Sequence, residues 1–196
     1  MRSGIILAGG RSTRFGGGEK SLRPVGGRPM ICRVRDALDG VVDELVVSVR
    51  DEGQRDLVAP LVPGLTFVYD EVRDIGPLAG VQASLKAARG EYVAIVACDM
   101  PFLSGKAIGL LFERAEGHDA AVPIQENGFL EPLHAVYRRE PMLRAVETSM
   151  GRNESRISAP LSHLEDVAYV PVEELERADP GLRTFLNVNR AEDLPQ

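Results

Sequence analysis

A glycine-rich segment near the N-terminus combines small residues with cations, the two features that phosphate binding needs. Residues 7–20 read LAGGRSTRFGGGEK, with five glycines among fourteen positions. Glycines let backbone N–H groups approach phosphate oxygens without obstruction by a Cβ atom. Arg11, Arg14 and Lys20 add charge-assisted hydrogen bonds. The segment therefore predicts a phosphate-holding loop, with a flexible surface loop as the alternative.

Two well-known phosphate motifs do not match this segment. Walker A requires Gly-Lys-Ser/Thr in direct succession, and here Glu19 separates Gly18 from Lys20. The dinucleotide fingerprint G-x-G-x-x-G begins correctly at Gly16 but meets Ser21 where it needs its third glycine. Neither motif therefore accounts for this segment, and a flexible surface loop remains the alternative.

An acidic residue follows one of the most apolar runs of the chain. Residues 92–97 read YVAIVA, and Asp99 comes two positions later. A carboxylate at the end of a buried strand suits Mg²⁺, which takes one or two protein carboxylates and completes its shell with phosphate oxygens and water. The alternatives are that Asp99 caps a helix beginning near Ser104 or solvates a loop.

A second acid stands at the end of another predicted strand. Asp70 follows residues 66–69 (TFVY). An acid at the end of a buried strand lies where ligands of parallel sheets bind, although Asp70 could be an ordinary turn acid.

Polar residues near the C-terminus are candidates for binding a second substrate. Asn187 and Asn189 alternate on a strand predicted at residues 184–188 and would therefore share a face, although a local Asx turn is equally consistent. Arg156 lies in the polar, basic stretch 151–158 (GRNESRIS), which could hold an acceptor phosphate. An isolated arginine is more often simply solvated.

The elements that must position these residues follow from hydrophobic periodicity. Buried strands are predicted at residues 4–7, 44–49, 66–69, 92–97, 120–124 and 132–137, and helices at 76–89, 104–116 and 139–150. Ser104 is the expected N-cap of the second helix and Gly90 the C-cap of the first. Alternation of apolar strands with amphipathic helices indicates an α/β fold with a mostly parallel sheet, in which ligands bind at the carboxyl ends of strands.

Composition indicates one ordinary domain over residues 1–196, without repeats or a linker. The net charge of −6 argues against nucleic acid as a partner. The apolar run 5–8 is too short for a signal peptide or a membrane span. Cys32 and Cys98 form no C-x-x-C pair, which favours a reducing, cytoplasmic compartment, and Cys98 is expected to pack in the core. The three histidines lack metal-ligand spacing, and His134 is expected to pack within a strand.

Short motifs in a fixed order extend this interpretation. The sequence contains, in order, Leu7-Ala8-Gly9-Gly10, Arg14, Gly16, Lys20, Gly27-x-Pro29, Gly76-Pro77-Leu78-Ala79-Gly80, Cys98-Asp99-Met100-Pro101, Glu131-Pro132-Leu133, Phe185-Leu186-Asn187-Val188-Asn189 and Glu192-Asp193-Leu194. This arrangement, from residue 5 to residue 194, resembles the small nucleotidyltransferases. Within them it is most similar to the molybdenum cofactor guanylyltransferases of the MobA type.

The resemblance implies a three-layer, Rossmann-like nucleotidyltransferase (nucleotide-diphospho-sugar transferase) fold. It implies transfer of GMP from GTP to molybdopterin-bound molybdenum, with Mg²⁺ as cofactor and pyrophosphate as product. The implied partners are GTP, a molybdopterin-type cofactor and, transiently, molybdoenzyme-maturation proteins, with neither nucleic acid nor membrane. The catalytic residues that the resemblance implies are Arg14, Lys20 and Asp99, and Asp99 is also the implied metal ligand. The implied nucleotide-binding residues are Leu7, Ala8, Gly9, Gly10, Lys20, Ser48, Asp70 and Asp99. The implied acceptor-binding residues are Asn187, Asn189 and Arg156.

Three positions depart from the family pattern. Ser48 stands where an asparagine that contacts the nucleotide is usual, Phe15 replaces the usual methionine, and Glu19 replaces the usual aspartate. The acid that matches Asp70 contacts the guanine nucleotide in this family, either through two hydrogen bonds to the N1–H and N2–H₂ edge of guanine, which adenine lacks, or through the ribose. Gly9 is typical of the guanylyl branch, because cytidylyl relatives carry alanine there and its methyl group would crowd the base. The alternatives are a guanylyltransferase acting on adenosylcobinamide phosphate, a cytidylyltransferase acting on the molybdenum cofactor, and a catalytically silent GTP-binding regulatory module.

Overall fold

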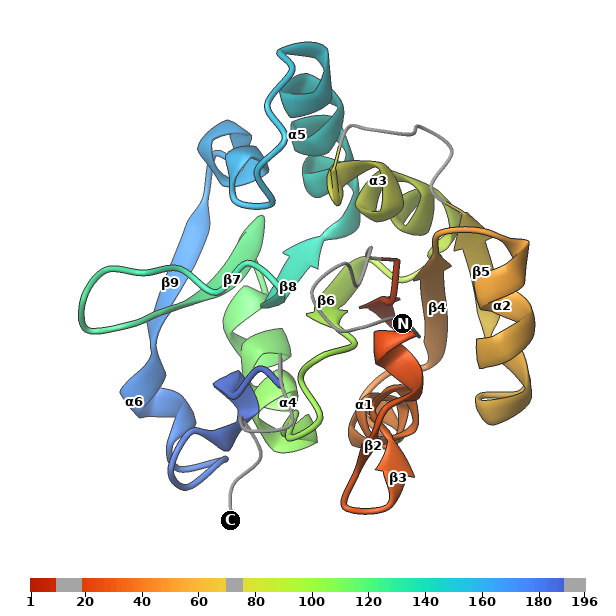
Figure 1. The fold of residues 1–196 in the computed structure, drawn as a ribbon. Coiled ribbons are helices and arrows are strands. Elements are labelled where there is room, and N and C mark those ends of the chain that lie inside the picture. The colour runs from red at the N-terminus through yellow and green to blue at the C-terminus, as the bar shows by residue number, and fades with distance from the viewer. Residues whose placement is uncertain (10–18, 70–75, 189–196) are drawn as a thin grey trace.

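The computed structural model describes residues 1–9, 19–69 and 76–188 (Figure 1). Its main feature is a seven-stranded sheet with the order β5-β4-β1-β6-β8-β7-β9. The strands are β1 (Arg2–Leu7), β4 (Glu44–Val49), β5 (Thr66–Tyr69), β6 (Tyr92–Ala97), β7 (Ala120–Ile124), β8 (His134–Arg138) and β9 (Val167–Pro171), and a separate hairpin joins β2 (Pro24–Val25) to β3 (Arg28–Pro29).

Strand directions confirm the mostly parallel sheet. β1 pairs in parallel with β4 and β6, β4 with β5, and β7 with β9. β8 pairs antiparallel with both of its neighbours, so it alone runs against the other strands of this sheet. The carboxyl ends of β1, β4, β5, β6 and β7 therefore meet at one edge, and β8 begins there.

Helices cover both faces of the sheet and give three layers (Figure 1). The described helices are α1 (Met30–Leu38), α2 (Glu52–Val58), α3 (Leu78–Ala87), α4 (Gly105–Ala115), α5 (Arg139–Gly151) and α6 (Val172–Leu175), with 3₁₀ turns η1 (Lys20–Leu22), η2 (Ala59–Leu61), η3 (Ala159–His163) and η4 (Arg183–Phe185). Buried residues of α1, α2, α4 and α6 belong to one core cluster, and those of α3 and α5 to another. The fold thus has a core on each side of the sheet.

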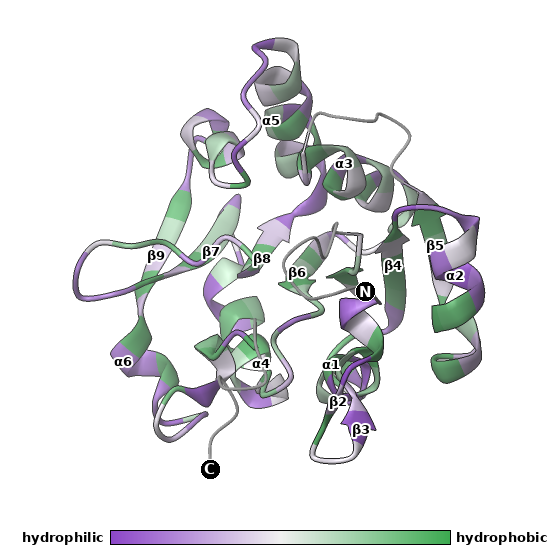
Figure 2. Ribbon diagram, in the orientation of Figure 1, coloured by the Kyte–Doolittle hydropathy of each residue, from purple (hydrophilic) through white to green (hydrophobic). Residues whose placement is uncertain are grey.

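The central strands are apolar at consecutive positions because both of their faces are buried. Ile5 and Ile6 on β1 point to opposite cores, as do Ile95 and Val96 on β6, and all four are at most 1% exposed. Burial removes the polar face that a half-exposed strand would show. The hydropathy colouring of Figure 2 accordingly shows hydrophobic residues in the strands and hydrophilic residues in many connecting turns.

Two predicted details are wrong. Gly90 is not the C-cap of α3, because that cap is Ala88 in an extended conformation. A Cβ atom on Gly90 would lie 2.4 Å from Ser3 Oγ, and the Gly90 N–H donates to this oxygen at 2.8 Å. Glycine is needed here because two segments approach closely, not because the helix ends.

The strand predicted at residues 184–188 is the second error. Residues 183–185 form η4, and the following residues to Val188 are irregular. The Val188 N–H donates to the Asp99 carbonyl (3.0 Å), and Thr184 Oγ1 accepts the Ser104 N–H (3.0 Å). These bonds tie the segment to the chain that follows β6, while β9, which was not predicted, takes the edge of the sheet.

Candidate active site

The carboxyl ends of β1 and β4 shape the entry to the glycine-rich segment. Leu7 pairs with Ser48 across the two strands. The Ser48 carbonyl accepts the N–H groups of both Ala8 (2.9 Å) and Gly9 (3.0 Å), while the Cys98 N–H donates to the Leu7 carbonyl (3.1 Å). The chain therefore leaves the sheet at Gly9, at the edge where ligands of parallel sheets bind.

These bonds involve two of the residues that the sequence predicts to bind the nucleotide. The Gly9 amide, expected to bind phosphate, donates to the Ser48 carbonyl. The Ser48 side chain, expected to contact the nucleotide, belongs to a residue that is only 1% exposed within the sheet. Phosphate contacts from backbone amides are then expected beyond Gly9, and Gly10 lies outside the described residues.

Lys20 and Asp99 meet although 79 positions separate them. Lys20 opens η1, Asp99 lies in the turn after β6, and Lys20 Nζ is 2.6 Å from Asp99 Oδ2. Their side chains are 21% and 25% exposed. A pair largely shielded from water keeps more of its electrostatic strength than a surface pair. The structure thus brings together two of the three predicted catalytic residues; Arg14 lies outside the described residues.

The surroundings of Asp99 fit a cation held mainly by a bound nucleotide. The recognised partner of the Asp99 carboxylate is Lys20, which lies at Oδ2. Among the described residues, no group of three or more His, Cys, Asp or Glu gathers around a common point. One carboxylate suffices for Mg²⁺ when phosphates and water complete its octahedron. The capping alternative is wrong, because Ser104 Oγ accepts the Ala107 N–H at the start of α4.

Glu19 and Gln54 form a polar network that sequence reasoning missed. The Glu19 carboxylate accepts hydrogen bonds from Arg50 Nη2 (2.6 Å) and Gln54 Nε2 (2.8 Å). The hydrogen bond to Glu19 raises the pKa of Arg50, with Asp51 adding to the effect against desolvation. The signal in the sequence that could have revealed this network is Glu19 itself, which replaces the usual aspartate. The side chain of glutamate is longer than that of aspartate and can therefore bridge two partners.

His134 supports the C-terminal segment from the start of β8. Its ring is fully buried, with Nε2 3.2 Å from Thr184 Oγ1 and its centroid 4.7 Å from that of Phe185. Burial lowers the pKa of His134 to about 3, so the imidazole is neutral at physiological pH. The prediction of a packed histidine is confirmed.

Cys98 is a core residue, as expected. It is 6% exposed, and burial raises the pKa of its thiol to about 12, with the neighbouring Asp99 adding to the effect. A thiol with this pKa stays protonated and is a poor nucleophile. Both Cys98 and Cys32 are free thiols.

The predicted acceptor residues come from separate segments. Asn187 is exposed and precedes Val188, whose N–H is bonded to the Asp99 carbonyl. Arg156 is exposed in the turn between α5 and η3. Asn187 therefore has the closer structural link to Asp99. Asn189 and Asp70 lie outside the described residues.

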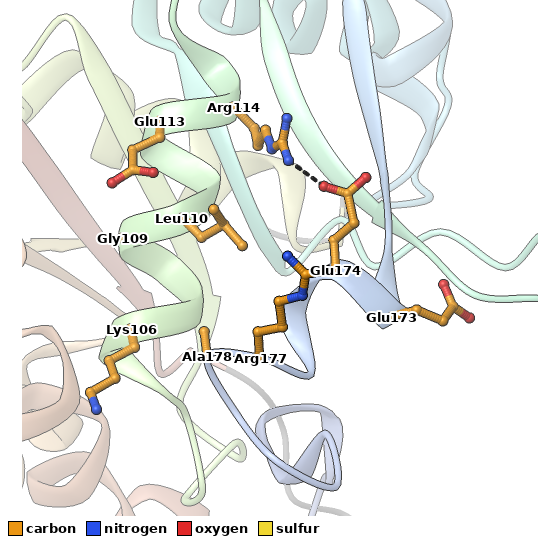
Figure 3. A pocket seen from close by; sticks show the side chains of 9 residues that line it. All are labelled: Lys106, Gly109, Leu110, Glu113, Arg114, Glu173, Glu174, Arg177 and Ala178. Atoms are coloured by element: carbon orange, nitrogen blue, oxygen red, sulfur yellow. Dashed lines mark hydrogen bonds and ion pairs between the residues drawn. The ribbon is translucent and has the colours of Figure 1, made fainter.

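A cavity of about 780 Å³ opens elsewhere, between α4 and α6 (Figure 3). Its wall mixes three cations with three carboxylates, and Arg114 is bonded to Glu174 across it (2.5 Å). None of the predicted nucleotide-binding residues lines it, so the site at the strand ends remains the candidate. Within the described part of the chain, no helix is long and apolar enough to cross a membrane.

Comparison with known proteins gives consistent results. Residues 4–167 match the family model described as "MobA-like NTP transferase domain". The chain is 41% identical over 199 residues to a "Probable molybdenum cofactor guanylyltransferase" of Methanosarcina mazei, covering 99% of this chain and 88% of the relative. It is 45% identical over 195 residues to a protein of the same description from Natronomonas pharaonis, covering 98% and 95%.

A solved structure agrees with the fold. The crystal structure of molybdopterin-guanine dinucleotide biosynthesis protein A from Archaeoglobus fulgidus superimposes with a TM-score of 0.82 at 29% identity. The match covers 98% of this chain and 94% of the other. The three-layer nucleotidyltransferase fold expected from the sequence is confirmed.

Proposed function

Because this chain belongs to the MobA-like NTP transferase family, we propose that it transfers GMP from GTP to the molybdenum cofactor. An oxygen of the acceptor's terminal phosphate attacks the α-phosphorus of GTP, the bond between the α-phosphorus and the bridging oxygen breaks, and pyrophosphate leaves. The products are molybdopterin guanine dinucleotide and pyrophosphate. The names of the relatives support the choice of substrates.

The observation that carries the proposal is the Lys20–Asp99 pair at the carboxyl end of β6. A transferase that forms no covalent intermediate works by positioning its substrates and neutralising charge. Lys20 would bind the phosphates and offset the charge that develops on the leaving pyrophosphate, with Arg14 assisting. Asp99 would hold Mg²⁺, which supplies further neutralisation of the phosphates when bound.

Substrate recognition is divided between the ends of different strands. Gly9 leaves room for guanine, and Asp70 would bind the nucleotide from the end of β5. Asn187 and Asn189 would bind the acceptor beside Asp99, with Arg156 reaching its phosphate. We place this reaction in the cytoplasm, with transient contact to molybdoenzyme-maturation proteins; the two free thiols favour a reducing compartment.

The first experiment is calorimetric titration with the Mg²⁺ complexes of GTP, CTP, ATP and UTP. Selective binding of GTP supports the guanylyl assignment. Preference for CTP would move the chain to the cytidylyl branch and overturn the role given to Gly9. GTP binding without pyrophosphate release, with molybdenum cofactor and cobinamide phosphate both supplied, would favour a regulatory module.

The second experiment replaces Asp99 by asparagine, which keeps the shape of the side chain and removes its charge. We expect kcat to fall about 100- to 1,000-fold, the range typical for losing one electrostatic stabiliser of a transition state. Asp56→Asn is the control, because the Asp56 side chain is 72% exposed in a surface ion pair with Arg55. Pyrophosphate release is measured against Mg²⁺ concentration, and an Asp99→Asn variant with wild-type turnover would contradict the assignment.

A further inference from the structure

We infer that Gln54 is a positioning residue that fastens the two ends of the glycine-rich segment to each other and to α2. This inference rests on the proposed function, because it concerns how the segment and Lys20 are held for catalysis. Gln54 belongs to none of the sequence motifs. Its hydrogen bonds within the described residues join it to Ala8, Glu19, Arg50 and Asp51, and not to Lys20 or Asp99.

The side-chain amide of Gln54 uses both of its hydrogens on the ends of the segment. Nε2 donates to the Ala8 carbonyl (2.9 Å) and to Glu19 Oε2 (2.8 Å). Ala8 lies at the start of the glycine-rich segment, and Glu19 directly follows its last glycine, Gly18. A single amide group therefore bridges the point where the segment begins and the point where it ends.

Gln54 is itself held firmly. Its Oε1 accepts the Arg50 N–H (2.7 Å), and its own N–H donates to Oδ1 of Asp51, the N-cap of α2 (2.8 Å). The residue is 1% exposed, so water cannot reach its polar atoms to form substitute hydrogen bonds in the folded state. α2 is anchored in turn by Val58, which is fully buried in the core.

Glu19 transmits this restraint to the catalytic pair. Its Oε2 accepts from Gln54 and its Oε1 from Arg50, and its side chain is only 15% exposed. Lys20 follows directly in the chain and reaches Asp99 across 2.6 Å. Fixing Glu19 on both oxygens fixes the backbone from which Lys20 extends, so Gln54 acts on the reaction through Glu19 and Lys20.

Gln54→Leu tests the inference, because leucine keeps most of the volume and removes both donors and the acceptor. Gln82→Leu is the matched control, since Gln82 also donates to a glutamate, Glu147 (3.2 Å), but on the exposed surface between α3 and α5. We expect Gln54→Leu to lower kcat about tenfold to hundredfold, the range that small displacements of positioned groups produce. Gln82→Leu should keep wild-type kcat.

All variants are assayed at a temperature where their own unfolding curves show them fully folded. A glutamine that only stabilised the fold would then leave kcat unchanged, so a wild-type kcat for Gln54→Leu overturns the inference. Glu19→Ala provides a second route, because it releases the segment from the other side and leaves the buried Gln54 in place. We expect it to lower kcat similarly while hydrogen exchange of the Arg50 amide stays slow, whereas Gln54→Leu accelerates that exchange. Wild-type turnover in Glu19→Ala would also overturn the inference.

Calorimetric GTP binding separates this inference from the proposed function. We expect both variants to bind Mg²⁺–GTP about tenfold more weakly than wild type and Gln82→Leu. If the wild-type protein binds GTP but transfers no GMP, the transferase proposal fails, and weaker binding by Gln54→Leu still supports the fastening role. If Gln54→Leu binds GTP as tightly as wild type, the fastening role fails whatever the reaction proves to be.

Discussion

His134 is expected to make the folded protein less stable as the pH falls below 6.5. Its ring is fully buried, and among the described residues Nδ1 has no hydrogen-bond partner. Thr184 Oγ1 already accepts the Ser104 N–H, so the hydroxyl proton can be donated to His134 Nε2. This arrangement suits a neutral imidazole that accepts at Nε2, and a second ring proton would bury a positive charge that no carboxylate offsets among the hydrogen bonds of the ring.

The size of the effect follows from the two pKa values. Burial lowers the pKa of folded His134 to about 3 from its ordinary 6.5, which the unfolded chain retains. Between these values the unfolded chain binds a proton that the folded chain does not, so stability falls as the pH falls, by about 1.4 kcal/mol per pH unit. The contribution is complete above pH 6.5, and about 2 kcal/mol of it is lost at pH 5.

Urea denaturation at pH 7, 6 and 5 measures this loss. His134→Gln lacks the titrating group. Between pH 7 and pH 5, the free energy of unfolding of wild type should therefore fall by about 2 kcal/mol more than that of His134→Gln. His118→Gln is the control, because the His118 side chain is 42% exposed in a surface pair with Asp166, and it should follow wild type. A His134→Gln variant with the full wild-type pH dependence would refute the reasoning.

The remaining expectations concern two glycines of α4 and one carboxylate of β4. Gly105→Ala should lower the melting temperature by about 2–12 °C, because its Cβ would lie 2.2 Å from a carbonyl oxygen of α1. Gly109→Ala should raise it by a few degrees, because nothing lies within 4 Å of its Cβ and alanine favours helix; thermal melts in which both shift the same way would exclude this account. Burial alone would raise the pKa of Glu44, but hydrogen bonds from Ser3 and Arg89 outweigh it and hold the pKa below 4.5. The stabilisation that the Glu44 carboxylate provides is therefore present above about pH 4.5 and is lost as the pH falls below that value. In urea titrations from pH 6 to pH 3, the free energy of unfolding of Glu44→Gln should fall less steeply than that of wild type, and an equally steep fall would show that Glu44 does not contribute.

The sequence predicted most of the central sheet because buried parallel strands carry their signal locally. Residues 44–49, 66–69, 92–97 and 120–124 were expected as strands and form β4, β5, β6 and β7 with those bounds. Each is a short, largely apolar run bounded by polar or turn residues. In β4, β6 and β7, burial on both faces demands that composition, while the edge strand β5 is only partly buried. The N-cap at Ser104 was also confirmed, because capping depends on residues three positions apart.

Features that depend on distant partners could not be predicted in this way. β9 is a short edge strand with an exposed Tyr169, so it lacks a continuous apolar run. Thr184 and Val188 read as strand residues, yet their hydrogen bonds go to residues 80 and 89 positions away. The position of Asp99 at the end of β6 was readable from the sequence, while its pairing with Lys20 required the fold.

The reversed direction of β8 has a consequence for how this enzyme family can diversify. Because β8 runs against its neighbours, β7 and β8 are joined by a hairpin loop, residues 125–133, that opens at the same edge as the ends of β1, β4 and β6. A hairpin loop can grow or shrink without moving the strands that carry it, since doubling its length costs only about 0.6 kcal/mol in closure entropy. Changes in its length and composition can thus reshape this rim while leaving β1, β4 and β6 in place. Under the proposed function, the preference for an acceptor can therefore change in this loop without moving Lys20 or Asp99.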